Sequence, residues 1–422
     1  MEQFLIRGGK PLKGEIEVRG AKNAAFPLLA ATLLTDKVCL IRNLPLIEDI
    51  FRMIEVLKSL GAKISCPEPR TLRISNKKIE LSKIKKEIVS VFRGSILLYG
   101  SLLARIGKIS LPQPGGCLIG ARPIDTHLDA FSQLGVRISQ KGNLLTLQRG
   151  TKIGNSVILL NEFSVTATCN TLLFSALLAK EITIKIADED YQVQELLKIL
   201  GKMGVKIKKI GHHLITIQGK RELKGFNHTL LPDPIEAGTF IILAAATKSK
   251  VLIKNVPFEF LELFLKKLKS AGLPLKMNLQ KKSLEVLPWK SLRLGKVQSL
   301  PYPGIHSDLL SPLAVLATQA QGATLIQDPL YEGRFKYLEE LNRMGAQIFF
   351  ADPHRIIVQG PTPLYGRKLG SIDLRGGAGL IIAALVAEGE STIDNIYQID
   401  RGYERIEERL QRIGANIKRI KV

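Results

Sequence analysis

A glycine-rich segment, Gln113–Asp125 (QPGGCLIGARPID), places a single cysteine, Cys117, five residues before an arginine, Arg122. Prolines end the strand-like segment before it, and its glycines allow backbone conformations that other residues resist. The sequence therefore predicts Cys117 on a mobile loop. A guanidinium group near a thiol can lower the pKa of that thiol and so favour the reactive thiolate. The alternative interpretation is a glycine-rich surface turn that holds an incidental cysteine.

Polar and charged residues also begin each of six long apolar segments. The N-terminus of a helix has free N–H groups and a partial positive charge, so it can bind an anion, and basic residues there strengthen the attraction. If the helices in each of two groups direct these ends toward the cleft between the groups, we expect that cleft to attract anions. The residues at these starts are Lys22 with Asn23, Arg93, Ser164, Glu236, Ser307 with Asp308, and Arg375.

The elements that position these residues form an internal repeat. An amphipathic helix, a small-residue turn and a strand recur six times, as in VLKSLGAKI and RLQRIGANI, with a period of about 70 residues. Each repeat carries a second helix that is apolar on nearly every face, as in IEAGTFIILAAAT, and such a helix must be buried on all sides. The turn glycines are Gly61, Gly135, Gly204, Gly272, Gly345 and Gly414.

Six fully buried helices are too many to pack around one axis, so we expect two groups of three. The first three repeats end near Leu231, and LPDPIEAG begins the fourth. A length of 422 residues agrees with two or three domains. Period-2 apolar segments after the buried helices predict strands, so the fold class is α/β.

Composition limits the classes of function. The longest apolar runs, such as Leu380–Ala387, are shorter than the ~20 residues of a membrane span, and no signal peptide is predicted, which favours the cytoplasm. Four cysteines without CxxC spacing predict neither a disulfide framework nor a metal site. The net charge of +23 lies mostly in solvated lysine-rich segments, and with 6% aromatic residues we expect no nucleic-acid stacking platform.

The ordered motifs GAKNAAFPLLAATLLTD, PGGCLIGARPID, LPDPIEAGTF, YEGRF, DLRGGAGL and IDRGYERIEERL extend over essentially the whole chain. In this order they resemble the enolpyruvyl transferases, and among these the enzymes that act on UDP-N-acetylglucosamine. The resemblance implies a two-domain inside-out α/β barrel with six repeats of about 70 residues, three in each domain. It places one domain at 22–231 and the other at 1–21 with 232–422.

The family transfers the enolpyruvyl group of phosphoenolpyruvate to the 3′-hydroxyl of UDP-N-acetylglucosamine and releases phosphate, the first committed step of peptidoglycan synthesis. The resemblance implies no cofactor and no metal. Four residues match the family's catalytic positions: Cys117, Asp308, Lys22 and Arg401. Six match its phosphoenolpyruvate site: Lys22, Asn23, Arg122, Arg334, Arg375 and Arg401. Its nucleotide-sugar site matches Arg93, Arg122, Pro123, Ile124, Asp125, Thr126, Phe163, Ser164, Val165, Asp308 and Leu330.

The residue types suit this chemistry. Addition of a hydroxyl across a double bond needs a base for the hydroxyl proton, for which Asp308 is suited, and an acid for the methylene carbon, for which Cys117 is suited. Guanidinium groups bind carboxylate and phosphate with two hydrogen bonds at once. The sequence departs from the family at Glu162 and Pro234, where a basic residue is usual. Either nearby cations such as Arg93, Lys152 or Arg122 compensate and nucleotide binding is only weaker, which we favour, or the chain is a diverged paralogue with an altered acceptor.

Structural interpretations of the same residues also stand. Asp308 with Ser307 could only cap a helix. Arg375 could pair with Asp373, and Arg401 with Asp400, as surface ion pairs. For the whole chain the alternatives are a shikimate-pathway type of enolpyruvyl transferase and a non-catalytic anion-binding or nucleic-acid-binding protein. The oligomeric state is left open.

Overall fold

The computed structural model describes residues 2–115, 120, 123–152, 154 and 156–421. Six turn glycines in it have a positive φ between 83° and 108°, a backbone conformation that residues with a Cβ rarely adopt. Each follows an amphipathic helix and precedes a strand, so the predicted repeat is confirmed. These glycines are Gly61, Gly135, Gly204, Gly272, Gly345 and Gly414.

The helices before these glycines lie on the outside, and each leaves part of its surface exposed. In α2 the buried apolar residues include Ile50, Met53 and Leu57, the spacing of a single helix face. The outer helices are α2 (Glu48–Ser59), α5 (Asp125–Gln133), α7 (Tyr191–Met203), α9 (Glu262–Ser270), α11 (Leu338–Arg343) and α14 (Ile406–Gln411). Shorter helices are α3 (Lys86–Val89) and α13 (Tyr397–Asp400).

The other helix of each repeat is buried on all sides, as its composition predicts. Every residue of α8 is buried, including Glu236 and Thr239. These central helices are α1 (Lys22–Ala31), α4 (Leu97–Ile106), α6 (Val165–Ser175), α8 (Pro234–Ala246), α10 (Leu310–Gln319) and α12 (Leu374–Val386). Short 3₁₀ turns are η1 (Thr32–Leu34), η2 (Leu81–Lys83), η3 (Arg93–Ile96), η4 (Phe258–Phe260) and η5 (Ser307–Leu309).

Contacts divide the chain into two units. Unit 1 consists of residues 2–19, 120 and 232–421, and unit 2 of residues 20–115 and 123–231, as far as the described residues go. In unit 1 the central helices α8, α10 and α12 pack against one another, and in unit 2 the helices α1, α4 and α6 do so. Among the described residues, no helix is both long and apolar enough to cross a membrane.

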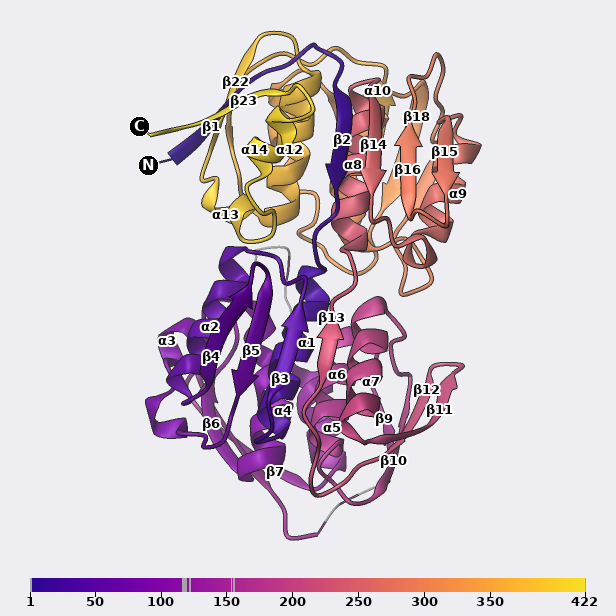
Figure 1. Ribbon diagram of the computed structural model, residues 1–422. Coiled ribbons are helices and arrows are strands. Elements are labelled where there is room, and N and C mark those ends of the chain that lie inside the picture. The colour runs from indigo at the N-terminus through magenta and orange to yellow at the C-terminus, as the bar shows by residue number, and fades with distance from the viewer. Residues whose placement is uncertain (1, 116–119, 121–122, 153, 155, 422) are drawn as a thin grey trace. The chain divides into compact units, whose positions relative to one another are not determined.

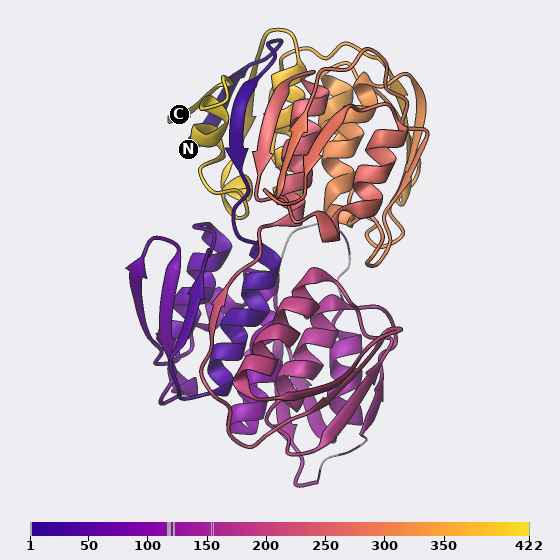
Figure 2. The same ribbon diagram turned by 45° about the vertical axis from the view of Figure 1, so that its right-hand side comes forward.

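Three sheets cover the helices of unit 1 (Figures 1 and 2). The first, β21-β22-β1-β23, comprises β21 (Lys368–Gly370), β22 (Glu390–Asp394), β1 (Glu2–Arg7) and β23 (Asn416–Lys421). The second, β15-β16-β14-β2, comprises β15 (Leu275–Asn278), β16 (Ser283–Val286), β14 (Lys250–Lys254) and β2 (Lys13–Glu17). The third, β17-β18-β20-β19, comprises β17 (Lys296–Gln298), β18 (Gly322–Gln327), β20 (Arg355–Gly360) and β19 (Gln347–Asp352).

The described part of unit 2 also has three sheets. The first, β13-β3-β5-β4, comprises β13 (Asn227–Thr229), β3 (Cys39–Arg42), β5 (Thr71–Ser75) and β4 (Lys63–Glu68). The second, β6-β8-β7, comprises β6 (Lys108–Pro112), β8 (Leu144–Arg149) and β7 (Val136–Lys141). The third, β11-β12-β10-β9, comprises β11 (Lys206–Gly211), β12 (Leu214–Gln218), β10 (Glu181–Lys185) and β9 (Val157–Leu159).

The N-terminal strands belong to unit 1. Strand β1 lies between β22 and β23 and is antiparallel to both, with Glu2 opposite Lys421 (Figure 1). Strand β2 runs parallel to β14, with Ile16 opposite Ile253. Segments from the two ends of the sequence therefore complete the same sheet.

A buried ion pair ties the N-terminal segment to the core of unit 1. Arg409 donates from both terminal nitrogens to the Glu236 carboxylate, at 2.6 and 3.1 Å, and from Nη2 to the carbonyl oxygen of Glu17 at 2.6 Å. The backbone N–H of Arg19 donates to the same carboxylate at 2.7 Å. Because Glu236 and Arg409 are both buried, loss of either leaves an uncompensated charge away from water.

We therefore expect Arg409→Met to lower the free energy of unfolding of unit 1 by about 3–5 kcal/mol, measured by urea denaturation. The matched control is Arg405→Met on the segment that enters the same helix. Arg405 is 74% exposed and pairs with Glu408 at 3.4 Å, so its loss should cost less than about 1 kcal/mol. Equal losses in the two variants would contradict a stabilising role for the buried pair.

Candidate functional site

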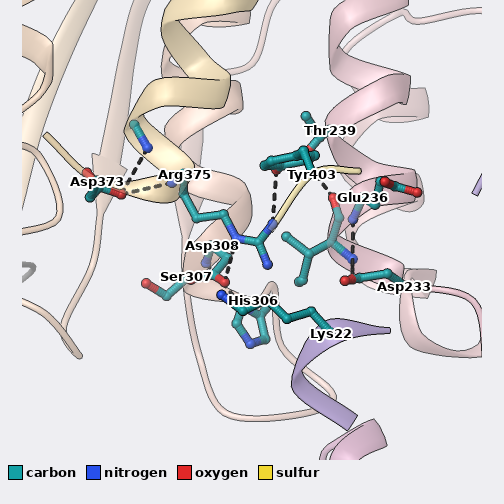
Figure 3. A network of polar contacts seen from close by, with 12 residues as sticks. Lys22, Asp233, Glu236, Thr239, His306, Ser307, Asp308, Asp373, Arg375 and Tyr403 are labelled. Carbon is teal, nitrogen blue, oxygen red and sulfur yellow. Dashed lines mark hydrogen bonds and ion pairs between the residues drawn. The ribbon is translucent and has the colours of Figure 1, made fainter. Parts of the chain in front are cut away.

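One end of unit 1 gathers charged side chains from the starts of its central helices (Figure 3). Asp308 lies in η5, directly before α10, and Arg375 lies in the first turn of α12. Arg375 donates from Nε to Oδ2 of Asp308 at 2.9 Å, and Arg334 donates from Nη2 to Oδ1 at 2.9 Å. Both oxygens of the Asp308 carboxylate are thus bound by guanidinium groups. The structure brings together these three residues, which the sequence predicts for one site.

Local hydrogen bonds explain how these side chains are presented. The Nδ1 atom of His306 accepts from the backbone N–H of Asp308 at 3.0 Å, so His306, and not Asp308, caps η5. Asp373 caps α12 by accepting from the N–H groups of Arg375 and Gly376, at 2.9 and 3.0 Å. The alternatives in which Asp308 is only a cap, and in which the Arg375 guanidinium pairs with Asp373, are therefore wrong.

A second carboxylate, that of Asp328, also contacts Arg334. Asp328 is fully buried, and its Oδ2 atom lies 3.5 Å from Nε of Arg334 and accepts from the hydroxyl of Ser307. Nε of Arg334 also donates to Oγ of Ser307 at 3.0 Å. The backbone N–H of Leu330 donates to Oδ1 of Asp328 at 3.0 Å, which places this predicted nucleotide-sugar residue beside the cluster.

The electrostatics of the cluster keep Asp308 ionised. Burial raises the pKa of Asp308, but the positive charges of Arg375 and Arg334 outweigh it and hold that pKa well below its usual range. A carboxylate with a low pKa and two bound guanidinium groups is a weak proton acceptor. Any loss of positive charge from these guanidinium groups would raise the pKa of Asp308.

Arg401 directly follows α13 and is buried. Its Nη1 atom donates to Oε1 of Gln398 at 3.0 Å. Asp400 does not hold it as the sequence alternative suggests, because both Asp400 oxygens accept from Arg419, at 2.7 and 2.9 Å. That alternative is therefore wrong.

In unit 2, the start of α1 carries a buried charge. Nζ of Lys22 lies 2.8 Å from Oδ2 of Asp49 in the first turn of α2, and both side chains are less than 10% exposed. This carboxylate offsets the unfavourable interaction between an ammonium group and the positive end of a helix. Asn23 follows Lys22 and is half-buried.

A second group in unit 2 assembles around the start of α5. Nη2 of Arg93 donates to the carbonyl oxygen of Pro123 at 3.0 Å. Ile124 immediately precedes this helix, and Asp125 and Thr126 lie in its first turn. The Thr126 hydroxyl donates to Oε1 of Glu162 at 3.1 Å, which connects this turn to the next predicted segment.

That next segment leads into α6. Ser164 caps the helix by accepting from the N–H of Ala167 at 3.3 Å, and Val165 is its first residue. The Phe163 ring is 42% exposed and contacts the His213 ring edge-on, with centroids 4.6 Å apart. The predicted nucleotide-sugar residues of unit 2 thus converge from three segments, while Cys117 and Arg122 lie outside the described residues.

Several supporting residues have no signal in the sequence. Asp49, Asp328 and Tyr403 contact the predicted residues through the fold, and no motif or periodicity singles out Asp49 or Asp328. Tyr403 alone gives a hint, because it stands two residues after Arg401 in the conspicuous segment IDRGYER.

Comparisons with known proteins place this geometry in context. Residues 6–410 match the family model of EPSP synthase (3-phosphoshikimate 1-carboxyvinyltransferase). The chain is 38% identical to the UDP-N-acetylglucosamine 1-carboxyvinyltransferases of Treponema denticola, over 99% of each chain, and of Bacteroides thetaiotaomicron, over 100% of each. Its structure resembles the enolpyruvyl transferase NikO from Streptomyces tendae, with a TM-score of 0.90, 24% identity and coverage of 100% and 99% of the two chains. The EPSP synthase from Acinetobacter baumannii gives 0.75 at 18% identity, with full coverage of both.

A buried histidine beside the unit 2 group makes the stability of that unit depend on pH. Nδ1 of His127 accepts from the side-chain amide of Asn170 at 2.9 Å, and Nε2 is 3.0 Å from Oγ1 of Thr166. Burial, aided by the charge of Arg93, lowers the pKa of His127 to about 3. The folded chain therefore excludes a proton that the unfolded chain binds below about pH 6.5.

We expect the free energy of unfolding of unit 2 to fall as the pH drops below about 6.5, with a contribution from His127 of up to about 1.4 kcal/mol per pH unit. In His127→Gln this contribution should disappear, as urea denaturation between pH 7 and 4.5 would reveal. His212→Gln is the control, since His212 is exposed and its replacement should leave the slope unchanged. The same slope in His127→Gln and in the wild type would contradict the explanation.

Proposed function

The chain belongs to the enolpyruvyl transferase family of EPSP synthase, and we propose that it transfers the enolpyruvyl group of phosphoenolpyruvate to the 3′-hydroxyl of UDP-N-acetylglucosamine. The relatives that share 38% identity over their full length, and carry the name of this activity, support the choice of acceptor. Phosphate is the second product, and the reaction opens peptidoglycan synthesis. The location that the sequence predicts for it is the cytoplasm.

The proposal rests on a buried nitrogen of Arg375 that has no acceptor among the described residues. Its Nε and Nη1 atoms have acceptors, but its Nη2 atom is buried and has no hydrogen-bond partner among the described residues. A buried guanidinium N–H without an acceptor is costly, and an anionic oxygen is the partner that it binds most strongly. The carboxylate and phosphate of phosphoenolpyruvate both supply such oxygens.

The chemistry follows from the residues around Arg375. In the addition step the sugar 3′-oxygen forms a bond to C2 of phosphoenolpyruvate, the hydroxyl proton passes to a base, and C3 gains a proton. In the elimination step C3 loses a proton, the double bond returns, and phosphate leaves C2. In this proposal Asp308 accepts the hydroxyl proton, and Cys117 donates a proton to C3.

Binding of the donor substrate prepares the base. An anion bound to Arg375 and Arg334 offsets the positive charge that holds the pKa of Asp308 low, and competes with Asp308 for their N–H groups. The Asp308 carboxylate then becomes a better proton acceptor when phosphoenolpyruvate is bound. The charge that develops on the tetrahedral intermediate is stabilised by the same fixed guanidinium groups.

The remaining predicted residues complete two binding sites in this proposal. Phosphoenolpyruvate is bound by Lys22, Asn23, Arg122, Arg334, Arg375 and Arg401. The nucleotide sugar is bound by Arg93, the segment 122–126, the segment 163–165, Asp308 and Leu330. The side-chain contacts within each unit support these groupings, and no metal is required by them.

The first test is release of inorganic phosphate from phosphoenolpyruvate in the presence of UDP-N-acetylglucosamine, with and without excess chelator. We expect activity in both conditions, and a loss of at least about a hundredfold in kcat for Asp308→Asn, the usual size of a lost general base. Asp352→Asn is the control: Asp352 pairs with Arg355 in a partly exposed ion pair, and its variant should keep full activity. Absence of phosphate release by the wild type with both substrates would contradict the proposed function.

The second test concerns the departure at Glu162. A carboxylate that contacts Thr126 in the proposed nucleotide-sugar site repels a diphosphate, by about 1 kcal/mol at ~4 Å in water and more when partly buried. We expect Glu162→Lys to lower the KM for UDP-N-acetylglucosamine several-fold and to leave that for phosphoenolpyruvate nearly unchanged. No change in either KM would mean that Glu162 does not face the diphosphate. Faster turnover of another acceptor by the wild type would favour the altered-acceptor alternative.

A further inference from the structure

The hydroxyl group of Tyr403 links Arg375 to a central helix of unit 1. Nη1 of Arg375 donates to the Tyr403 hydroxyl oxygen at 3.0 Å, and this oxygen lies 3.0 Å from Oγ1 of Thr239 on α8 (Figure 3). The Tyr403 side chain is 1% exposed. Tyr403 follows α13, and Arg375 begins α12, so three separate segments meet at one hydroxyl group.

The directions of these hydrogen bonds can be assigned. Oγ1 of Thr239 donates its proton to the carbonyl oxygen of Ile235 at 2.8 Å, so toward Tyr403 it acts as the acceptor. The Tyr403 hydroxyl therefore donates to Thr239 and accepts from Arg375 with its lone pair. Burial raises the pKa of Tyr403, so the hydroxyl keeps its proton at neutral pH. Each hydrogen bond in this series therefore has a fixed donor and a fixed acceptor, from Arg375 through Tyr403 and Thr239 to the carbonyl oxygen of Ile235.

This arrangement fixes the plane of the Arg375 guanidinium. Its Nε atom donates to Asp308, its Nη1 atom donates to the Tyr403 hydroxyl, and its Cζ atom lies 5.3 Å from the centroid of the Tyr403 ring. Two directed bonds on one planar group leave it no free rotation. The third nitrogen, Nη2, is thereby held in one position, buried and without a partner among the described residues.

We propose that Tyr403, supported by Thr239, is a positioning residue that fixes the Arg375 guanidinium so that Nη2 is presented to the anionic donor substrate. This inference rests on the proposed function, because it assigns the anion to phosphoenolpyruvate. Tyr403 itself does not touch the substrate. It acts through the orientation of Arg375.

A neutral acceptor suits this role better than a carboxylate. A second carboxylate on Arg375 would cancel its charge and weaken its attraction for an anion, whereas a hydroxyl satisfies one N–H and leaves the charge in place. Asp308 already supplies one negative charge to Arg375. The protein thus holds the guanidinium at Nε with a carboxylate and at Nη1 with a neutral hydroxyl group.

Tyr337 offers a matched control in the same unit. It is also fully buried, and its hydroxyl donates to the carbonyl oxygen of Ser311 at 2.6 Å, away from Arg375. Tyr337→Phe and Tyr403→Phe each remove one buried hydroxyl and keep the ring. A role in stability alone predicts the same kinetic behaviour for the two variants.

The experiment measures the KM for each substrate by phosphate release. We expect Tyr403→Phe to raise the KM for phosphoenolpyruvate about tenfold, the effect of weakening one hydrogen bond to a charged group, and to change that for UDP-N-acetylglucosamine less than about twofold. Tyr337→Phe should change neither. Thr239→Val should raise the KM for phosphoenolpyruvate by a smaller factor, and should add nothing in the Tyr403→Phe background because Thr239 acts through Tyr403.

Calorimetric titration of phosphoenolpyruvate, with and without UDP-N-acetylglucosamine, separates this inference from the proposed function. An active wild type with equal phosphoenolpyruvate constants in Tyr403→Phe and Tyr337→Phe overturns the inference and leaves the function intact. A wild type that binds phosphoenolpyruvate but releases no phosphate overturns the function, and weaker binding in Tyr403→Phe than in Tyr337→Phe then still supports the inference. A wild type that does not bind phosphoenolpyruvate overturns both.

Discussion

The pairing of Asp308 with two guanidinium groups is the interaction on which one end of unit 1 depends. Three ionised groups are withdrawn from water there, at a cost of several kcal/mol for each before they find partners. Their remaining N–H groups and oxygens need partners as well. Asp328 and Ser307 contact Arg334, and the Tyr403 hydroxyl accepts a hydrogen bond from Arg375. The charged groups of the cluster therefore depend on one another, because loss of one ionised side chain leaves a buried charge without its counter-charge.

The packing of the central helices makes this cluster possible. In α12, a Cβ on Gly376 would lie 2.8 Å from Cβ of Tyr337, and one on Gly377 would lie 2.6 Å from the Ile399 side chain. The helix thus approaches its neighbours more closely than alanine would allow. Arg375 directly precedes these two glycines in the first turn of α12. The charged cluster therefore lies next to the closely packed part of α12.

The sequence predicts the architecture well because its signals are local. The six turn glycines and the all-round apolar helices need only a short window to be recognised, and both are present as predicted. Side-chain partners are different, because they join residues far apart in the chain. Asp308 binds Arg375, 67 residues away, and local reasoning offered Asp373 for Arg375 and a capping role for Asp308. Asp49 opposite Lys22, and Tyr403 beside Arg375, are likewise consequences of tertiary packing that no local pattern encodes.

The pairing of β1 with β22 and β23 has a consequence for the order of folding during synthesis. Ile6 pairs with Ser391 and Ile417, so β1 is synthesised long before the two strands that it pairs with. Unit 2 is complete in sequence once Leu231 has emerged, and domains generally fold as units during translation. The nascent chain therefore holds a finished unit 2 between an unpaired strand and an unfinished partner. Contacts of such long sequence separation form slowly, so completion of unit 1 is the late step of folding.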